Sequence, residues 1–469
     1  MKRSDARSLW AVLAVLGLAA TASSHPGDVS PTVETQAVFS TGDAADDICV
    51  WIHPTDPSQS LVIGTDKKRG LETYDLSGNL VQEVAEGHFN NVDLRYGFPL
   101  GGTEVALVAT SNRVDDSIVV YAVDPVTRTL NNVTSRQLKT GITLYGCCLY
   151  RSPISGELYF FGNSKGGSVE QWWLFDDGAG KVDAKLVRSF TVGTACEGSV
   201  ADDHYGWYFV SEEAVGIWRY GAEPGDGDAR YQVDSTGTGG HLQPDVEGLA
   251  LYQTLDGGGY LIASSQGADN YVVYHRAGGQ AYVTSFAIIA GNGIDGVGGT
   301  DGIDVTNFPL GKGFPLGTFI AQDDNNDTGN QNFKLVPWES IANTVQPPLS
   351  IDTLNDPRDG GSSPVRFHTN PLGECQEAAY VSVGVDGGSE YAKSRFLVFA
   401  SFKLTPDFTD LLSPMVLIFA RTDSVGEWLS PQYYMPPGTK GMTVYARLVI
   451  ENLKVRELKW SPILPTRIY

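Results

Sequence analysis

The chain has little cysteine for its length. Its 469 residues include five cysteines: Cys49, Cys147, Cys148, Cys196 and Cys375. An odd number leaves at least one thiol unpaired, and five are too few for a disulfide scaffold in a chain of this size. No two of them have the Cys-x-x-Cys spacing of a zinc site, and the adjacent pair favours core filling. Zinc chemistry is therefore not expected.

Positive charge is also scarce. The chain has 33 Lys and Arg against 55 Asp and Glu, a formal net charge of −22. Binding to a phosphate backbone depends on a basic surface, so a nucleic-acid partner is not expected. For most surface acids, solubility is a sufficient explanation, but the excess of carboxylates also suits cation binding.

After the N-terminal segment, no apolar run reaches the roughly 18 residues of a membrane-spanning helix. The first residues carry Lys2 and Arg3, an apolar run over 9–20 and small residues up to Ser24. This pattern is typical of a secretory signal peptide, here 1–24, and an uncleaved anchor is the alternative. We expect a secreted protein, extracellular or periplasmic, and a monomer.

What the chain does have is a repeat of about 50 residues, in which a short apolar strand opens after a polar or acidic group. Taking one opener from each unit, successive steps are 46, 52, 52, 50 and 54 residues for Asp47, Asp93, Tyr145, Glu197, Glu247 and Asp301. This spacing is close to that of four-stranded propeller blades. The sequence therefore predicts an all-β fold with a six-bladed β-propeller.

A second strand in each unit ends in a polar loop, and a third strand carries an aromatic residue. The loops hold Lys67 and Lys68, Arg113, Lys165, Glu212 and Glu213, Gln266 and Asp323, and the aromatic residues are Tyr74, Tyr121, Trp173, Trp218, Tyr274 and Trp338. Equivalent points of successive blades lie at one end of a propeller. We therefore expect the openers and these loops to converge there.

The converging groups combine oxygen ligands with cations. Carboxylates without clustered His or Cys favour calcium, whereas the basic residues would weaken cation binding unless an anion lay between them. A multiply phosphorylated substrate meets both conditions, and metal-assisted attack by water is the expected chemistry.

The motifs that other phosphate chemistries need are absent from the sequence. There is no Arg-His-Gly motif, no His-Cys-x5-Arg loop and no Walker-type loop, and the seven histidines are scattered, each more easily read as structural. Two alternatives stay open: a calcium-dependent lactonase or esterase, which would have no use for the basic residues, and a non-enzymatic binding propeller, which would need exposed aromatic anchors.

Four strings resemble those of the β-propeller (alkaline) phytases. They are Asp43-Ala44-Ala45-Asp46-Asp47, Asn90-Asn91-Val92-Asp93, Pro244-Asp245-Val246-Glu247-Gly248 and Thr300-Asp301-Gly302-Ile303-Asp304-Val305. The similarity runs from about residue 35 to about residue 343. It implies a phosphoric monoester hydrolase of the 3-phytase type that acts on phytate, or calcium-phytate, with several Ca²⁺ ions and a calcium-activated water.

The resemblance also implies roles for residues. Catalytic roles fall on Glu197, Asp245, Glu247, Asp304 and Tyr145. Phosphate contacts fall on Lys67, Lys68, Arg113, Lys165 and Arg188. Metal ligands fall on Asp47, Asn91, Asp93, Glu197, Glu212, Glu213, Glu247, Asp301, Asp304 and Asp323. Gly166-Gly167 stands where the family has an acid after Lys165, which predicts one carboxylate fewer.

The similarity ends before a Gly- and Pro-rich stretch. We expect a propeller domain over 35–345, a linker over 346–378 and a β-rich domain over 379–469. Apolar runs of strand length in the last segment predict a small β-sandwich of unknown function.

Overall fold

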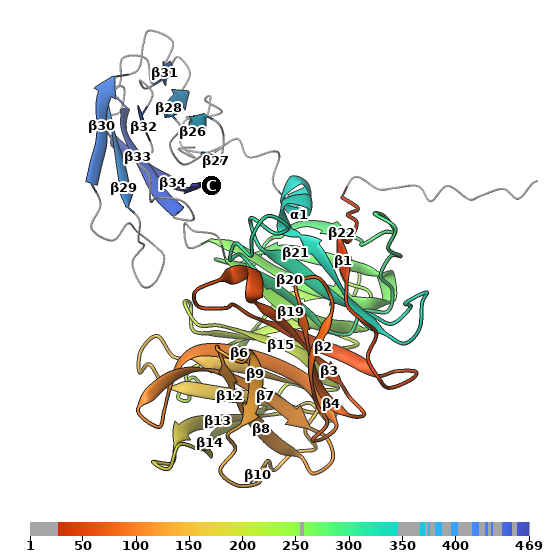
Figure 1. Cartoon of the computed structure of the whole chain (residues 1–469). Coiled ribbons are helices and arrows are strands. Elements are labelled where there is room, and N and C mark those ends of the chain that lie inside the picture. The colour runs from red at the N-terminus through yellow and green to blue at the C-terminus, as the bar shows by residue number, and fades with distance from the viewer. Residues whose placement is uncertain are drawn as a thin grey trace, which may run out of the picture.

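The computed structural model describes residues 27–253 and 258–345, and the strands between Arg366 and Ile468. The expected signal peptide and most of the expected linker lie outside the described residues. Six separate antiparallel sheets make up the first part, each a meander of four main strands. Figure 1 shows them following one another in chain order.

Blades 1 to 3 begin after the N-terminal strand β1 (Val33–Glu34). Blade 1 contains β2 (Ala45–Trp51), β3 (Leu61–Asp66), β4 (Gly70–Asp75) and β5 (Leu80–Val84). Blade 2 contains β6 (Phe89–Leu100), β7 (Thr103–Asn112), β8 (Ser117–Asp124) and β10 (Leu138–Lys139), with β9 (Thr129–Asn132) also paired to β8. Blade 3 contains β11 (Cys147–Arg151), β12 (Leu158–Asn163), β13 (Ser168–Asp176) and β14 (Val182–Thr191).

Blades 4 to 6 repeat the plan. Blade 4 contains β15 (Cys196–Asp202), β16 (Trp207–Glu212), β17 (Gly216–Gly221) and β18 (Arg230–Ser235). Blade 5 contains β19 (Val246–Gln253), β20 (Gly259–Ser265), β21 (Asn270–His275) and β22 (Tyr282–Phe286). Blade 6 contains β23 (Ile303–Thr306), β24 (Thr318–Asp323) and β25 (Asn332–Pro337), and helix α1 (Trp338–Val345) follows. Two 3₁₀ turns lie at Pro57–Gln59 and Gln266–Ala268.

The first strands of the blades form a closed ring. Each contacts the next, in the order β2, β6, β11, β15, β19 and β23, and β23 returns to β2. This ring is the centre of a six-bladed propeller, and the expected fold class is confirmed.

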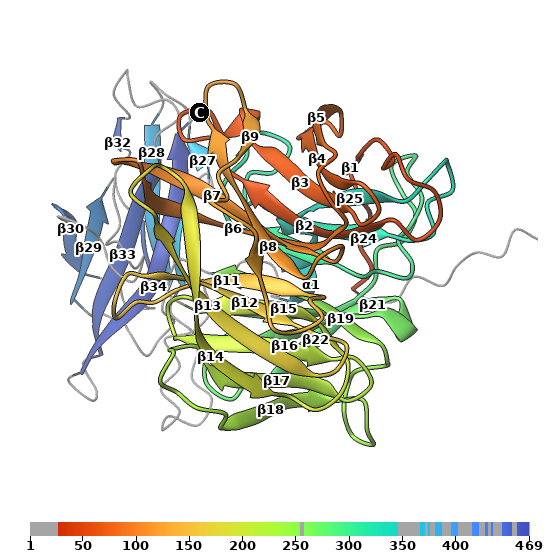
Figure 2. The same cartoon turned by 90° about the horizontal axis from the view of Figure 1, so that it is seen from below.

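The N-terminus completes blade 6. Strand β1 pairs with β25, with Val33 opposite Leu335 and Glu34 opposite Lys334, so it supplies the fourth strand of blade 6. Figure 2 shows β1, β25 and β24 beside one another. This strand lies just before residue 35, where the propeller domain was expected to begin. Its two residues carry no pattern that predicts a strand.

Apolar side chains fill the spaces between neighbouring blades. Each pair of adjacent blades shares its own buried cluster, because strands such as β3 send alternate residues to opposite neighbours. Leu61 and Ile63 pack toward blade 2, whereas Val62 packs toward blade 6. Strands buried on both faces are continuously apolar, which explains the runs seen in the sequence.

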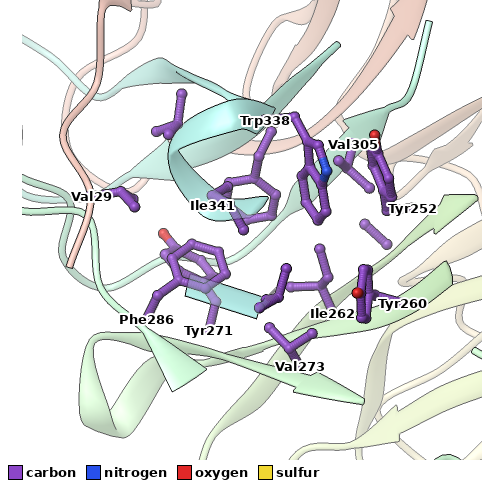
Figure 3. Close-up of a cluster of buried hydrophobic side chains, with 14 of the residues drawn as sticks. Val29, Tyr252, Tyr260, Ile262, Tyr271, Val273, Phe286, Val305, Trp338 and Ile341 are labelled. Atoms are coloured by element: carbon purple, nitrogen blue, oxygen red, sulfur yellow. The ribbon is translucent and has the colours of Figure 1, made fainter. Parts of the chain in front are cut away.

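Helix α1 covers the space between blades 5 and 6. Trp338 stacks on Tyr252 with ring centroids 3.6 Å apart and 12° between their planes, and Ile341 packs in the same cluster (Figure 3). Such aromatic pairs contribute about 1 kcal/mol beyond their buried area. The prediction that Trp338 belongs to a third strand is wrong, since β25 ends at Pro337; the other five predicted aromatic residues do lie on third strands.

Strands also occur after residue 365. One sheet holds β26 (Arg366–Asn370), β28 (Tyr380–Asp386), β31 (Glu427–Leu429) and β32 (Tyr433–Tyr434); another holds β27 (Glu374–Cys375), β34 (Glu457–Ile468), β33 (Thr443–Asn452), β29 (Arg395–Ser401) and β30 (Met415–Arg421). That these sheets form a sandwich stays a prediction. Among the described residues, no helix is long and apolar enough to span a membrane.

Candidate functional site

Bulges in the inner strands place the polar openers. In four of the six, the register to the second strand shifts by one residue at the pairs Asp46-Asp47, Asn90-Asn91, Glu197-Gly198 and Glu247-Gly248. A bulge re-aims neighbouring side chains that a regular strand would send to opposite faces. Equivalent openers are therefore Asp46 and Asn90, not Asp47 and Asp93 as the sequence spacing predicted.

Hydrogen bonds between blades hold each opener in position. A buried polar side chain at the end of one blade's second strand donates to the backbone carbonyl at the opening of the next blade. The pairs are Thr65 to Asn90 at 2.8 Å, Ser111 to Tyr145 at 2.6 Å, Asn163 to Glu197 at 2.7 Å, Ser211 to Glu247 at 2.6 Å and Ser264 to Thr300 at 2.8 Å. The positions of these openers are thus fixed by contacts within the ring.

Small residues let the inner strands approach one another. A Cβ at Gly198 would lie 2.0 Å from the carbonyl oxygen of Glu247, and one at Gly146 would lie 2.0 Å from that of Glu197. Only glycine fits such a contact without moving the backbone. These positions bring Glu197 and Glu247 close together at one end of the ring.

Three glutamates form the centre of the site. Oxygens of Glu197, Glu213 and Glu247 lie within 4.8 Å of one another. Burial, and then the charge of Glu197, raise the pKa of Glu247 well above its ordinary value; burial and the charge of Asp301 also raise the pKa of Glu197. Within the described part of the chain, Oε1 of Glu213 and Oε2 of Glu247 are buried without a hydrogen-bond donor.

This donor set fits a hard divalent cation. All of its ligand atoms are carboxylate oxygens, which Ca²⁺ prefers, and a positive ion would remove the repulsion that raises their pKa values. The buried oxygens without donors are the atoms such an ion would satisfy. Glu197, Glu213 and Glu247 would hold it.

A lysine whose side chain is only 10% exposed joins three further acids to the cluster. Nζ of Lys67 lies 2.9 Å from Asp46, 3.1 Å from Asp301 and 2.5 Å from Asp43. Burial alone would lower the pKa of Lys67, but the charges of Asp46 and Asp301 outweigh it and raise that pKa. Burial and the charge of Glu197 raise the pKa of Asp46 to about 8, and burial and the charge of Asp46 raise that of Asp301 to about 7.

Asn90 connects the acids with the bases. Its Nδ2 donates to Oε1 of Glu197 at 2.5 Å, and its Oδ1 accepts from Nη1 of Arg113 at 2.8 Å. Arg113 and Lys165 both lie over the ring of Tyr145, with Nζ of Lys165 4.2 Å and Cζ of Arg113 5.2 Å from its centroid. Five of the predicted site residues thus meet around Asn90: Glu197, Glu247, Tyr145, Arg113 and Lys165.

Beside the acids is an open, mostly basic pocket. It has a volume of about 330 Å³ and is lined by Asp43, Lys67, Lys68, His88 and Arg113. Three of these side chains, those of Lys67, Lys68 and Arg113, carry positive charge, and phosphate groups bind such arrangements. The arrangement can therefore hold an anion against one side and a cation against the other.

Comparisons with known proteins identify the family of this chain. The model of a family described as Phytase matches residues 4–361. A 3-phytase of Bacillus subtilis (strain 168) is 44% identical over 327 residues, which cover 68% of this chain and 85% of that protein. The chain belongs to the phytase family. It is an enzyme, a phosphoric monoester hydrolase, and the resemblance seen in the sequence is confirmed.

A second group of predicted phytase residues lies deeper in the ring. Asp47, Asn91, Asp93 and Asp304 line a small pocket of about 30 Å³ among the inner strands. Three of these acids bind backbone amides of neighbouring blades: Asp47 that of Val92 at 3.1 Å, Asp93 that of Leu149 at 2.8 Å and Asp304 that of Val50 at 2.9 Å. They connect blades, and metal binding by them stays a prediction.

Three other predicted residues of the phytase site lie outside the group of Glu197, Glu213 and Glu247. Glu212 accepts from Thr194 and from the indole of Trp218, which lowers its pKa despite the opposing effect of burial. Asp323 is ion-paired with buried Lys334 at 2.8 Å. Asp245 is exposed, and its charge contributes to the raised pKa of Glu213, for which burial is the first cause.

Arg188 is the clearest correction. It lies on β14, the outermost strand of blade 3, and its guanidinium donates to the carbonyls of Gly221 at 2.9 Å and Glu223 at 3.2 Å in blade 4. Its side chain is buried in those contacts. It therefore ties two blades together and does not reach the basic pocket.

Sequence reasoning also missed members of the phytase site. Asp46, Asn90, pocket-lining His88 and Gln266, which donates to Asp301 at 2.7 Å, lie beside the predicted residues but outside the predicted sets. Asp46 and Asn90 each directly precede a predicted ligand, and a one-residue bulge is invisible in spacing. The signal that could have found them is the doubled polar pair in both openers.

Proposed function

We propose that the chain is a secreted, calcium-dependent phytase that hydrolyses phosphate monoesters of myo-inositol hexakisphosphate. The observation that carries the proposal is the contact between two clusters of opposite charge, in which Asn90 binds Glu197 on one side and Arg113 on the other. A lactone would leave the basic pocket without a partner. The relative named 3-phytase supports the same substrate.

The basic residues would bind the substrate. Lys68 and Arg113 line the pocket, and Lys165 lies with Arg113 over the ring of Tyr145. Arg forms paired hydrogen bonds with phosphate oxygens, and Lys supplies a movable point charge. Together they would hold one phosphate group of the inositol ring with its phosphorus toward the glutamates.

The glutamates would serve the hydrolysis. Glu197, Glu213 and Glu247 would hold a divalent cation, which when bound would supply Lewis-acid polarisation of a phosphate oxygen and of water. Water would add to phosphorus and the bond from phosphorus to the inositol oxygen would break, with that oxygen leaving as a hydroxyl group after it takes up the proton lost by the attacking water. A carboxylate of Glu197 or Glu247 would accept the proton of the attacking water and pass it to the leaving oxygen.

Tyr145 would remain a proton donor throughout. Burial and the charges of Glu197 and Asp46 raise the pKa of its hydroxyl far above the ordinary value, so the hydroxyl stays protonated at neutral pH. The two cations over its ring keep that ring in place. Its hydroxyl can therefore donate to Glu197 or to a bound phosphate oxygen.

The activity is tested by phosphate release from phytate, first with Ca²⁺ added in steps and then with a chelator. Most of the calcium-dependent release should be lost in Lys67→Ala, in Arg113→Ala and in Glu197→Gln. The control Lys185→Ala, at an exposed position of β14, should keep it. A folded protein that binds calcium and releases no phosphate would reject the proposal.

Secretion rests on the N-terminal residues. Two basic residues, an apolar run and small residues up to Ser24 support export and cleavage. Mass spectrometry of the protein recovered from the periplasm or medium should show a chain that begins close to residue 25. A full-length chain retained in the cell would contradict export.

A further inference from the structure

Lys67 takes part in both halves of the site. Its ammonium lies between the carboxylates of Asp46 and Asp301 at 2.9 and 3.1 Å, and its side chain is only 10% exposed. The same residue lines the basic pocket with Lys68 and Arg113. Lys68 makes no such ion pair among the described residues, and its Nζ donates to the carbonyl of Thr41 at 2.6 Å.

The acids that hold Lys67 belong electrostatically to the glutamate cluster. Asp301 is close enough to raise the pKa values of Glu197 and Glu247. On the other side, Nδ2 of Asn90 lies 3.4 Å from Asp46 and 2.5 Å from Glu197. An ion bound at the glutamates would therefore sit close to the ammonium of Lys67, and like charges at short range in a buried site repel strongly.

We infer that Lys67 and the calcium ion compete for this acidic cluster, and that calcium binding releases the ammonium of Lys67 into the basic pocket, where it binds substrate phosphate. The flexible four-carbon side chain allows the ammonium to turn, because Lys67 already lines the pocket. This inference rests on the calcium dependence proposed above and adds a link between the two binding events.

The link has a thermodynamic consequence. If calcium frees Lys67 for phosphate, then a phosphate-like anion must in turn strengthen calcium binding by the same factor. Removing the charge of Lys67 should strengthen calcium binding in the absence of an anion, because the competitor is gone. It should also reduce the coupling, because the anion has lost the group that calcium releases.

The test is calcium titration by calorimetry, with and without myo-inositol hexakissulfate. This polyanion carries no phosphate, so the enzyme cannot release phosphate from it. Without the polyanion, Lys67→Met should bind calcium about tenfold more tightly than the unchanged protein, and the polyanion should then improve its affinity less than it improves that of the unchanged protein. Lys67→Gln, which keeps a donor for Asp46, repeats the measurement should Lys67→Met fold poorly. Lys68→Met is the matched control and should keep the original calcium affinity without the polyanion.

The outcomes separate the two proposals. Calcium affinity that is unchanged or weaker in both folded Lys67 variants would overturn the competition while leaving calcium dependence intact. An undiminished effect of the polyanion in those variants would overturn the link in the same way. A protein that binds no calcium and still releases phosphate from phytate would overturn both.

Discussion

The side-chain amide of Asn90 on blade 2 donates to Oε1 of Glu197 on blade 4 at 2.5 Å, a contact made across the ring. Its carbonyl oxygen accepts from Arg113. A side-chain amide can serve an acid and a base at once, because its nitrogen donates while its oxygen accepts. Arg113 and the acidic cluster are thus held in one geometry by a single residue.

Replacing Asn90 should therefore damage catalysis more than stability. In Asn90→Ala, both Glu197 and Arg113 lose a buried, charge-assisted partner, and kcat/KM for phytate should fall by about 10- to 100-fold. Steady-state kinetics with saturating calcium measure the effect. Asn131→Ala, at an exposed position of β9, is the control. Unchanged kinetics in folded Asn90→Ala would contradict the role.

Stability without calcium should depend on pH through Asp46 and Asp301. Their folded pKa values, about 8 and about 7, lie above the ordinary 3.8. At a pH between the ordinary and the folded pKa values, the unfolded chain has lost protons that the folded chain retains. The free energy of unfolding therefore falls as pH rises. In chelator, the melting temperature should drop by about 5 °C or more between pH 5.5 and 8.5.

Calcium should reverse this loss, because a bound cation offsets the charges of the deprotonated acids. Added Ca²⁺ should raise the melting temperature more at pH 8.5 than at pH 5.5. Asp46→Asn removes one of the two titrating groups and should flatten the profile in chelator. A melting temperature that rises with pH in chelator would show that these acids are not protonated in the folded protein.

Gly198 should tolerate no side chain. A Cβ there would lie 2.0 Å from the carbonyl oxygen of Glu247, a backbone atom in the ring. Gly198→Ala should cost about 3 kcal/mol of unfolding free energy and displace Glu247, with loss of activity. Gly225→Ala, which meets no atom within 4 Å, is the matched control. Denaturant unfolding distinguishes them, and equal stability would contradict the contact.

Arg188 should matter for stability alone. Arg188→Met leaves the carbonyls of Gly221 and Glu223 without their donor, so the melting temperature should fall. Its KM for phytate should stay within about twofold, whereas Lys68→Met should raise KM several-fold through loss of a phosphate contact. A large rise in KM for Arg188→Met would restore the role that the sequence suggested.

Much of the propeller could be predicted because each blade is local in sequence. The strands of a blade follow one another, and their apolar runs recur at a spacing that needs no tertiary information. The same locality predicted that Tyr145, Glu197, Glu247 and Asp301 would gather at one end. The N-terminal strand β1 escaped prediction because its partner β25 is distant in the chain and its two residues carry no pattern.

By itself, the sequence determined the number of repeats, the apolar and polar ends of each strand, and the meeting of acids and bases at one face. The tertiary structure decided which of two adjacent polar residues faces the site, through bulges that add one residue to an inner strand. It also decided that Arg188 faces blade 4 and that Asp323 binds Lys334. These choices depend on what lies opposite each side chain, and a partner from another blade is set only when the ring closes.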